Sequence, residues 1–161
     1  MYVLETGGMV LPRTTTYMEA ACTLATPLTL HPFAFRVHTH ELGRVVSGWR
    51  VSPDMEWTLV GKADPQREQM FWGVRDPGRK VIRGGDTLAA RCTMVSNRER
   101  ITWVGPTAAH EMCNFYLMYW VEGGAKLGDE RCYTVGPPVY SWDRILIGGL
   151  SNIPDREAST L

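Results

Sequence analysis

Residues 33–51, FAFRVHTHELGRVVSGWRV, combine two runs of β-forming residues with a short polar turn between them. β-Branched and aromatic residues are enriched in strands, and the side chains of a strand alternate between its two faces. On an extended chain Arg36, His38 and His40 therefore share one face, while Val37 lies on the other. The stretch predicts a strand that holds two imidazoles side by side on a polar face.

Similar β-type runs recur along the chain, separated by glycine, proline and polar clusters that are typical of turns. They lie at 33–37, 44–51, 56–61, 80–82, 87–95, 100–105 and 113–121. We find no apolar repeat of 3.6 residues long enough for an ordinary helix. Many short strands without intervening helices predict an all-β domain, either an antiparallel β-sandwich or a barrel. The Pro/Gly-rich tail from about residue 135 is expected to wrap the surface or to fray.

Length and charge exclude several classes of protein. The chain has 161 residues, which favours one domain with its own core, and a formal net charge of +0. Nucleic-acid binding is not expected, because there is no basic stripe, and no apolar run approaches the roughly 20 residues of a membrane span. The first residues, MYVLETGGMVLP, lack the basic start and apolar core of a signal peptide.

A second stretch with mixed faces lies at 110–120, HEMCNFYLMYW. With a period of two, Met112, Asn114 and Tyr116 share one face, and Cys113 lies on the opposite, apolar face. Each of the two predicted strands thus offers one face with polar groups and possible metal ligands, and one face suited to a core.

Two neutral imidazoles and a thioether would form a soft, uncharged set of ligands suited to copper that cycles through Cu(I). Zinc more often recruits a third His, a Cys or a carboxylate. The pattern leaves a second interpretation open, in which His38 and His40 are half-exposed strand residues and Met112 fills a gap in the core. We expect the neighbouring Glu41 and Glu111 to be solvated and His110 to be a loop residue.

The four cysteines, Cys22, Cys92, Cys113 and Cys132, leave two alternatives open. An even number fits two disulfides, with three possible connectivities, and it also fits four buried free thiols. There is no CxxC pair, which argues against a zinc ribbon or a thioredoxin-like site.

Four stretches together resemble a known family: HPFAFRVHTHELGRVVSGWRV (31–51), WTLVGKADPQ (57–66), GDTLAARC (85–92) and EMCNFYLMYW (111–120). They are similar to the C-terminal catalytic domain of the peptidylglycine α-hydroxylating monooxygenases, members of the copper type II, ascorbate-dependent monooxygenase family. The similarity runs in order from about residue 2 to 135. It implies a β-sandwich of jelly-roll type that carries an oxygen-binding copper.

The resemblance assigns roles to individual residues. The implied catalytic copper ligands are His38, His40 and Met112. The residues implied to hold the substrate are Arg36, Asn114 and Tyr116. The implied disulfides are Cys22–Cys132 and Cys92–Cys113, and two structural disulfides imply the secretory pathway, in a vesicle lumen or outside the cell.

The implied reaction is hydroxylation of the α-carbon of a C-terminal glycine in a glycine-extended peptide, the first step of peptide C-terminal amidation. O2 is the co-substrate, and ascorbate supplies electrons through a second copper, held by three histidines in a preceding N-terminal domain. This chain has four histidines, and two of them lie in the sequence His-Thr-His at 38–40, the HTH motif. It has no stretch that resembles that partner domain. We therefore expect a fragment without its signal peptide, with a copper domain at 1–135 and a tail at 136–161. Such a fragment would be inactive or weakly active alone.

Two other functions remain open. The chain could be the corresponding domain of a dopamine or tyramine β-hydroxylase, although an amine substrate would not need Arg36 to anchor a carboxylate. It could also be a non-catalytic secreted β-sandwich that binds copper.

Overall fold

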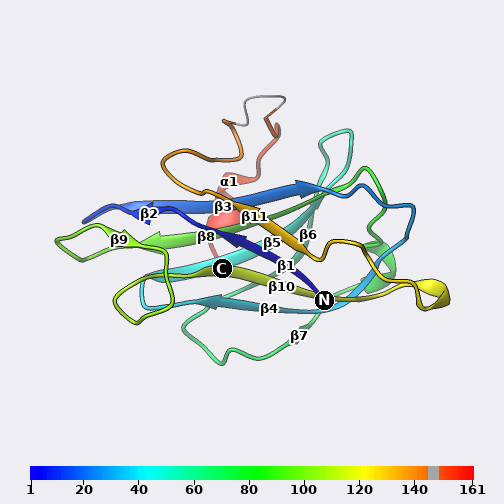
Figure 1. Ribbon diagram of the computed structural model, residues 1–161, viewed down its shortest axis with the longest axis horizontal. Helices are drawn as coiled ribbons and strands as arrows, with labels where there is room; N and C mark the ends of the chain where they lie inside the picture. Colours follow the sequence, from blue (N-terminus) through cyan, green and yellow to red (C-terminus); the bar gives the residue numbers. More distant parts are fainter. Residues whose placement is uncertain (145–148) are drawn as a thin grey trace.

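The computed structural model describes residues 1–144 and 149–161, and its regular secondary structure is almost entirely β-strand (Figure 1). The strands are β1 (Tyr2–Thr6), β2 (Met9–Val10), β3 (Thr15–Thr23), β4 (His31–Thr39), β5 (Gly43–Val51), β6 (Trp57–Ala63), β7 (Trp72–Gly73), β8 (Thr87–Val95), β9 (Thr102–Trp103), β10 (Cys113–Trp120) and β11 (Arg131–Thr134). The helical elements are two 3₁₀ turns, η1 (Pro77–Arg79) and η2 (Glu122–Gly124), and a single α-helical turn, α1 (Asp155–Ser159). Among the residues described, no helix is long and apolar enough to cross a membrane.

Two sheets form the body of the fold. One, which we call the β4–β10 sheet, has the strand order β11-β1-β10-β4-β7, and the other, the β5–β8 sheet, has the order β3-β8-β5-β6. β2 and β9 form a separate ribbon. The strand pairs are antiparallel except β1 with β11, which is parallel. This arrangement confirms the prediction of an antiparallel β-sandwich.

Two stacked aromatic rings fill the core directly beneath β4 and β10. Phe35 and Phe115 have ring centroids 5.6 Å apart and nearly parallel planes. A Cβ atom added at Gly48 would lie 2.2 Å from the Phe115 ring, and one added at Gly61 would lie 2.4 Å from the Phe35 ring. Because only glycine lets the rings approach this closely, the facing glycines allow the two sheets to pack tightly under the strands that carry HTH and EMCN.

The tail covers the outer face of the β5–β8 sheet. Trp142 is fully buried, and it belongs to a second apolar cluster with Trp49, Ala89 and Ala158. Figure 1 shows the tail beside β3, on the side of the molecule away from β4. Residues 145–148 of the predicted tail lie outside the described residues. Because β8 is covered on both faces, it is buried almost throughout, whereas most of β4 and β10 alternates between buried and half-buried residues.

A buried ion pair anchors this tail. Arg91 lies 2.5 Å from the Glu19 carboxylate and 2.7 Å from that of Asp155 on α1, and the second Glu19 oxygen accepts a bond from the Trp142 amide. Burial raises the pKa of Glu19 even though Arg91 opposes this shift. A cavity of about 560 Å³ lies beneath the tail beside Tyr140, apart from β4 and β10.

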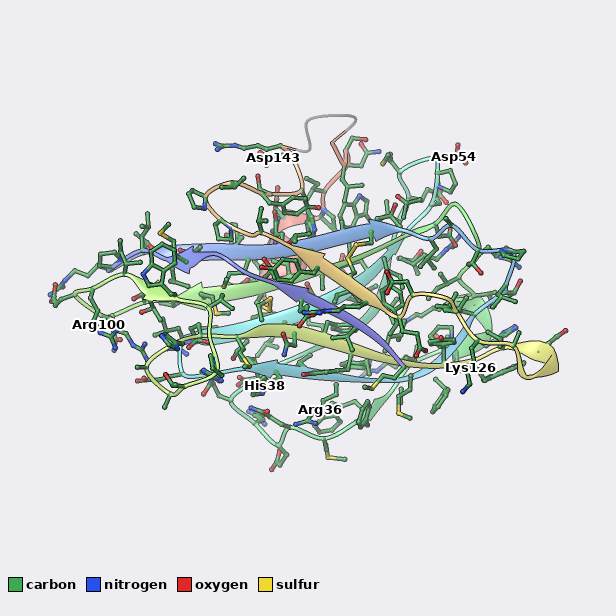
Figure 2. All side chains as sticks on the ribbon, in the orientation of Figure 1. Arg36, His38, Asp54, Arg100, Lys126 and Asp143 are labelled. Carbon is green, nitrogen blue, oxygen red and sulfur yellow. A yellow bond between two sulfur atoms is a disulfide. The ribbon has the colours of Figure 1, made fainter. Side chains whose placement is uncertain are left out.

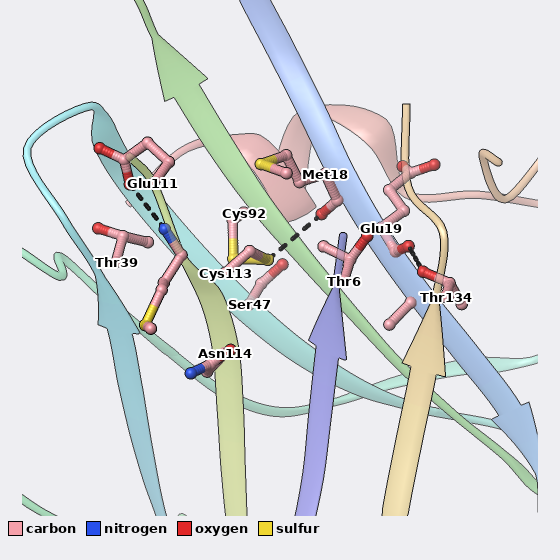
Figure 3. Close-up of a disulfide and its surroundings, with 12 residues drawn as sticks. Thr6, Met18, Glu19, Thr39, Ser47, Cys92, Glu111, Cys113, Asn114 and Thr134 are labelled. Carbon is pink, nitrogen blue, oxygen red and sulfur yellow. Dashed lines mark hydrogen bonds between the residues drawn. A yellow bond between two sulfur atoms is a disulfide. The ribbon is translucent and has the colours of Figure 1, made fainter. Parts of the chain in front are cut away.

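The structure contains the disulfides Cys22–Cys132 and Cys92–Cys113, which are the pairings that the resemblance implies. The second joins β8 to the first residue of β10 in the core, and Asn114 points to the opposite side (Figure 3). Two disulfides are typical of proteins that fold in an oxidising compartment.

The strand prediction is wrong in one place and incomplete in several others. Residues 80–82 form no strand, because Ile82 makes only an isolated bridge with Leu30 in a loop rich in glycine and charge. Strands β1, β2, β3, β7 and β11 were missed: β3 mixes polar and small residues that give a weak signal, and β2, β7 and β11 have only two to four residues. For β1 a signal was available, because YVLET opens with β-forming and apolar residues.

Candidate functional site

The pairing of β4 with β10 brings the two mixed faces together. Asn114 pairs with His38 and Tyr116 pairs with Arg36. All four side chains are half-buried, on the face of the sheet away from the core. Figure 2 shows Arg36 and His38 on the same side of β4, towards the loop that leads to β7.

Met112 lies directly before this paired region. Cys113 pairs with Thr39, so continuing the antiparallel register by one residue places Met112 opposite His40. Met112 is half-buried, as the two histidines are. The three candidate ligands therefore lie at one end of the β4–β10 pair.

The two imidazoles are held in defined orientations. Their ring centroids lie 5.4 Å apart and their planes are nearly perpendicular. Nδ1 of His38 lies 2.6 Å from Oε1 of Gln69, and Nδ1 of His40 lies 3.1 Å from the backbone oxygen of His110. Because amide and peptide oxygens can only accept, each Nδ1 donates and carries the proton. The lone pair of each Nε2 is then free to bind a metal.

Glu111 contradicts the expectation of a solvated carboxylate. It is fully buried, and its carboxylate accepts bonds from the backbone amides of His40 (2.9 Å), Leu42 (2.6 Å) and Met112 (3.2 Å). Figure 3 shows Glu111 reaching the segment that begins β10. The physical reason is that the turn after β4 presents main-chain donors that no sheet partner satisfies. Glu111 thus ties the segment of the HTH motif to the segment of Met112.

The other flanking residues follow the prediction. His110 lies in a loop, and its ring contacts the hydroxyl of Thr107 at 3.0 Å while its carbonyl accepts from His40. Glu41 is exposed and forms an ion pair with Arg98 at 2.8 Å. Glu111 differs from these two residues because it is fully buried and main-chain amides surround its carboxylate.

Arg36, Asn114 and Tyr116 form a polar group beside the histidines. Asn114 Nδ2 donates to the Tyr116 hydroxyl at 2.9 Å, and the Arg36 guanidinium lies 5.8 Å from the centre of the Tyr116 ring. The Nε atom of Arg36 is buried and has no hydrogen-bond partner among the described residues. Since a buried donor without a partner is costly, this atom suits a ligand that brings an acceptor, such as a carboxylate.

Sequence reasoning missed two glutamines in the loop between β6 and β7. Gln69 contacts the ring of His38, and Nε2 of Gln66 donates to the backbone oxygens of His40 (2.6 Å) and Gly43 (3.1 Å). Exposed polar residues in a loop give no periodic signal that could have identified them.

The donor set fits copper better than zinc or calcium. Its two imidazole nitrogens and one thioether are neutral and soft, whereas zinc sites recruit thiolates, further imidazoles or carboxylates and calcium sites recruit oxygen. Within residues 1–144 and 149–161, no three His, Cys, Asp or Glu side chains gather in a group that could hold a metal. A metal on this face would therefore depend on the thioether as a third ligand.

Comparison with known protein families gives one match along most of the chain. Residues 1–145 match the model of the "Copper type II ascorbate-dependent monooxygenase, C-terminal domain".

Individual relatives are similar over about two thirds to three quarters of the chain. It is 43% identical over 121 residues to peptidyl-glycine alpha-amidating monooxygenase B of Xenopus laevis, covering 74% of this chain and 13% of that protein. It is 48% identical over 113 residues to peptidyl-glycine alpha-amidating monooxygenase of Mus musculus, covering 69% and 11%. It is 34% identical over 110 residues to dopamine beta-hydroxylase of Homo sapiens, covering 66% and 18%. The chain thus spans only about a tenth to a fifth of the length of these relatives.

Proposed function

The chain belongs to the copper type II ascorbate-dependent monooxygenases, as their C-terminal domain, and on this premise we propose that it is the oxygen-binding copper domain of a peptidylglycine monooxygenase. The activity would be hydroxylation of the α-carbon of a C-terminal glycine. The observation that carries the proposal is the register of β4 with β10, which aligns Arg36 with Tyr116 and His38 with Asn114 on one face.

His38, His40 and Met112 would hold the copper. The protonated Nδ1 of each histidine leaves Nε2 as the metal-binding atom, and the thioether would complete a soft field that favours the reduced ion. Copper, when bound, would supply activation of O2 for insertion into a C–H bond. In this proposal the protein's task is to hold both imidazoles and the substrate in fixed relation, because a misplacement of about 1 Å can reduce the rate about a hundredfold.

Arg36 would anchor the carboxylate of the glycine-extended peptide. Its planar guanidinium can donate two parallel charge-assisted hydrogen bonds, and the unsatisfied Nε supports this role. Arg36 and His38 are two residues apart on one face, which corresponds to roughly 6.7 Å of strand. A peptide held at Arg36 would therefore present its last residue to the imidazoles, with Asn114 and Tyr116 beside it.

We infer two partners beyond the peptide. Ascorbate would be the reductant, through a second copper in the family's N-terminal domain, and this domain would complete the enzyme. The two disulfides support a place in the secretory pathway, in a vesicle lumen or outside the cell.

The match to dopamine beta-hydroxylase makes an amine hydroxylase the second candidate function. Arg36 distinguishes the two, since a phenethylamine has no carboxylate to pair with a guanidinium. A non-catalytic copper-binding domain is the third candidate.

Copper and ligand binding to the 161-residue chain test the proposal. We expect one copper per chain with a sulfur neighbour in X-ray absorption, strong loss of binding in His38→Ala, and no loss in His31→Ala, which removes the histidine that stacks on Trp120. A glycine-extended peptide should bind the copper-loaded chain, and a phenethylamine should not displace it. Displacement by the amine would favour the second function, and a chain that binds copper but no peptide would favour the third.

A further inference from the structure

The loop between β6 and β7, residues 64–71, lies against both candidate histidines. Gln66 binds the backbone oxygen of His40, and Gln69 reaches the ring of His38. The loop is folded on itself by Asp64, whose Oδ1 accepts the amide of Gln66 at 2.9 Å. Its attachment therefore consists of polar side-chain contacts to the end of β4.

The orientation of the Gln69 amide can be deduced from its other contact. Nε2 of Gln69 lies 3.3 Å from the backbone oxygen of Pro65, and this oxygen can only accept a hydrogen bond. The NH2 group must therefore face Pro65, and Oε1 must face His38.

The two imidazoles are held by partners of different kinds. The partner of His40 is a main-chain carbonyl, which side-chain substitution cannot remove. The partner of His38 is the side chain of Gln69, which is exposed and comes from a loop. The orientation of His38 thus depends on a single replaceable side chain.

We propose that Gln69 is a positioning residue, whose amide oxygen holds His38 in the Nδ1–H form with Nε2 directed to the metal. This rests on the proposed function only for the identity of the metal. Residues that bind the second nitrogen of a ligating histidine fix its tautomer and direction, and their loss typically weakens metal binding by about 10- to 100-fold.

The tautomer can be read without metal. We suggest ¹⁵N-resolved imidazole NMR on the metal-free 161-residue chain, followed by Cu(I) titration against a competing chelator. Wild type should show His38 in the Nδ1–H form. Gln69→Leu should give a mixture of tautomers at His38, leave His40 unchanged, and weaken Cu(I) binding roughly 10-fold, at the lower end because Gln69 is exposed. Gln69→Glu, which keeps an acceptor, should restore the tautomer and most of the affinity.

Two variants of the same loop are the controls. Glu68→Gln changes an exposed neighbour and should alter neither measurement. Gln66→Leu loosens the loop without touching a ring, so its effect on the His38 tautomer should be smaller than that of Gln69→Leu. An unchanged His38 tautomer in Gln69→Leu would overturn the inference. A wild-type chain that binds no copper would instead overturn the proposed function, while the NMR result would still decide the role of Gln69.

Discussion

Substitution of Glu111 by glutamine should destabilise the chain far more than its position in a loop suggests. The two carboxylate oxygens divide three main-chain donors between them: one accepts from Leu42, and the other from His40 and Met112. An amide offers only one oxygen and turns an NH2 group towards the remaining donors. At least one buried N–H therefore loses its acceptor and faces another donor.

The magnitude follows from these contacts. A hydrogen bond to a charged group contributes about 1.5–3 kcal/mol, and leaving a buried donor unsatisfied costs about 1–3 kcal/mol. Since Glu111 is fully buried, solvent cannot replace the lost acceptor. We expect Glu111→Gln to lower the free energy of unfolding by about 2–4 kcal/mol, a large part of the roughly 5–15 kcal/mol of a typical domain.

Urea unfolding measures this effect. The midpoint should fall with little change in the slope, which would indicate lost stability and not a changed unfolded state. Glu41→Gln is the matched control, because Glu41 directly follows the HTH motif in the sequence but is exposed, so loss of its pair with Arg98 should leave the urea midpoint nearly unchanged. A stability of Glu111→Gln within about 0.5 kcal/mol of wild type would refute the reasoning, since ordinary surface substitutions fall in that range.

Three further substitutions test other parts of the structure. Met112→Ile should abolish peptide hydroxylation in the two-domain protein while leaving it folded, and its X-ray absorption spectrum should lack the copper–sulfur signal. Normal turnover with that signal intact would exclude Met112 as a ligand. Arg36→Ala should weaken binding of a glycine-extended peptide about 30- to 150-fold, because it removes charge-assisted hydrogen bonds of about 2–3 kcal/mol. Calorimetry measures this binding, and a peptide that lacks the carboxylate is the control. Burial, and secondarily Glu19, raise the pKa of Tyr140 from 10.0 to about 12. The neutral phenol therefore stabilises the fold fully below pH 10, and this contribution is lost as the pH rises through 12. Between pH 10 and 12, the urea midpoint of Tyr140→Phe should fall less steeply than that of wild type. An equally steep fall in the two proteins would contradict the raised pKa of Tyr140.

The sequence was sufficient to predict which residues share a face. Period two placed Arg36 with His38 and Asn114 with Tyr116, and the structure has this alternation because β4 and β10 each bury one face. Periodicity could not predict that these two strands are neighbours, since they are separated by more than 70 residues and pairing depends on the whole topology. The resemblance to a known family supplied the expectation that the two strands carry one site.

Loop residues were the least predictable part. From the sequence alone, a glutamate next to a predicted strand is expected to be exposed to solvent. Only the structure shows that main-chain amides of the turn after β4 surround the carboxylate of Glu111. Gln69 has no signal of any kind, because its role depends on where a loop returns to the sheet. For Trp142 a signal was available: a large aromatic residue in a Pro/Gly-rich tail is costly to expose, and this favours wrapping over fraying.

The two halves of the candidate site are built with different rigidity. The segment of Met112 is fixed on both sides, by the buried Glu111 carboxylate and by the disulfide of Cys113. In the chain-entropy model, closing a loop across the 21-residue separation of this disulfide stabilises the fold by roughly 3 kcal/mol. His38 instead owes its orientation to Gln69 on an exposed loop. A change in the 64–71 loop should therefore alter the geometry of His38 while leaving the position of Met112 unchanged, so that metal affinity can vary without loss of the fold.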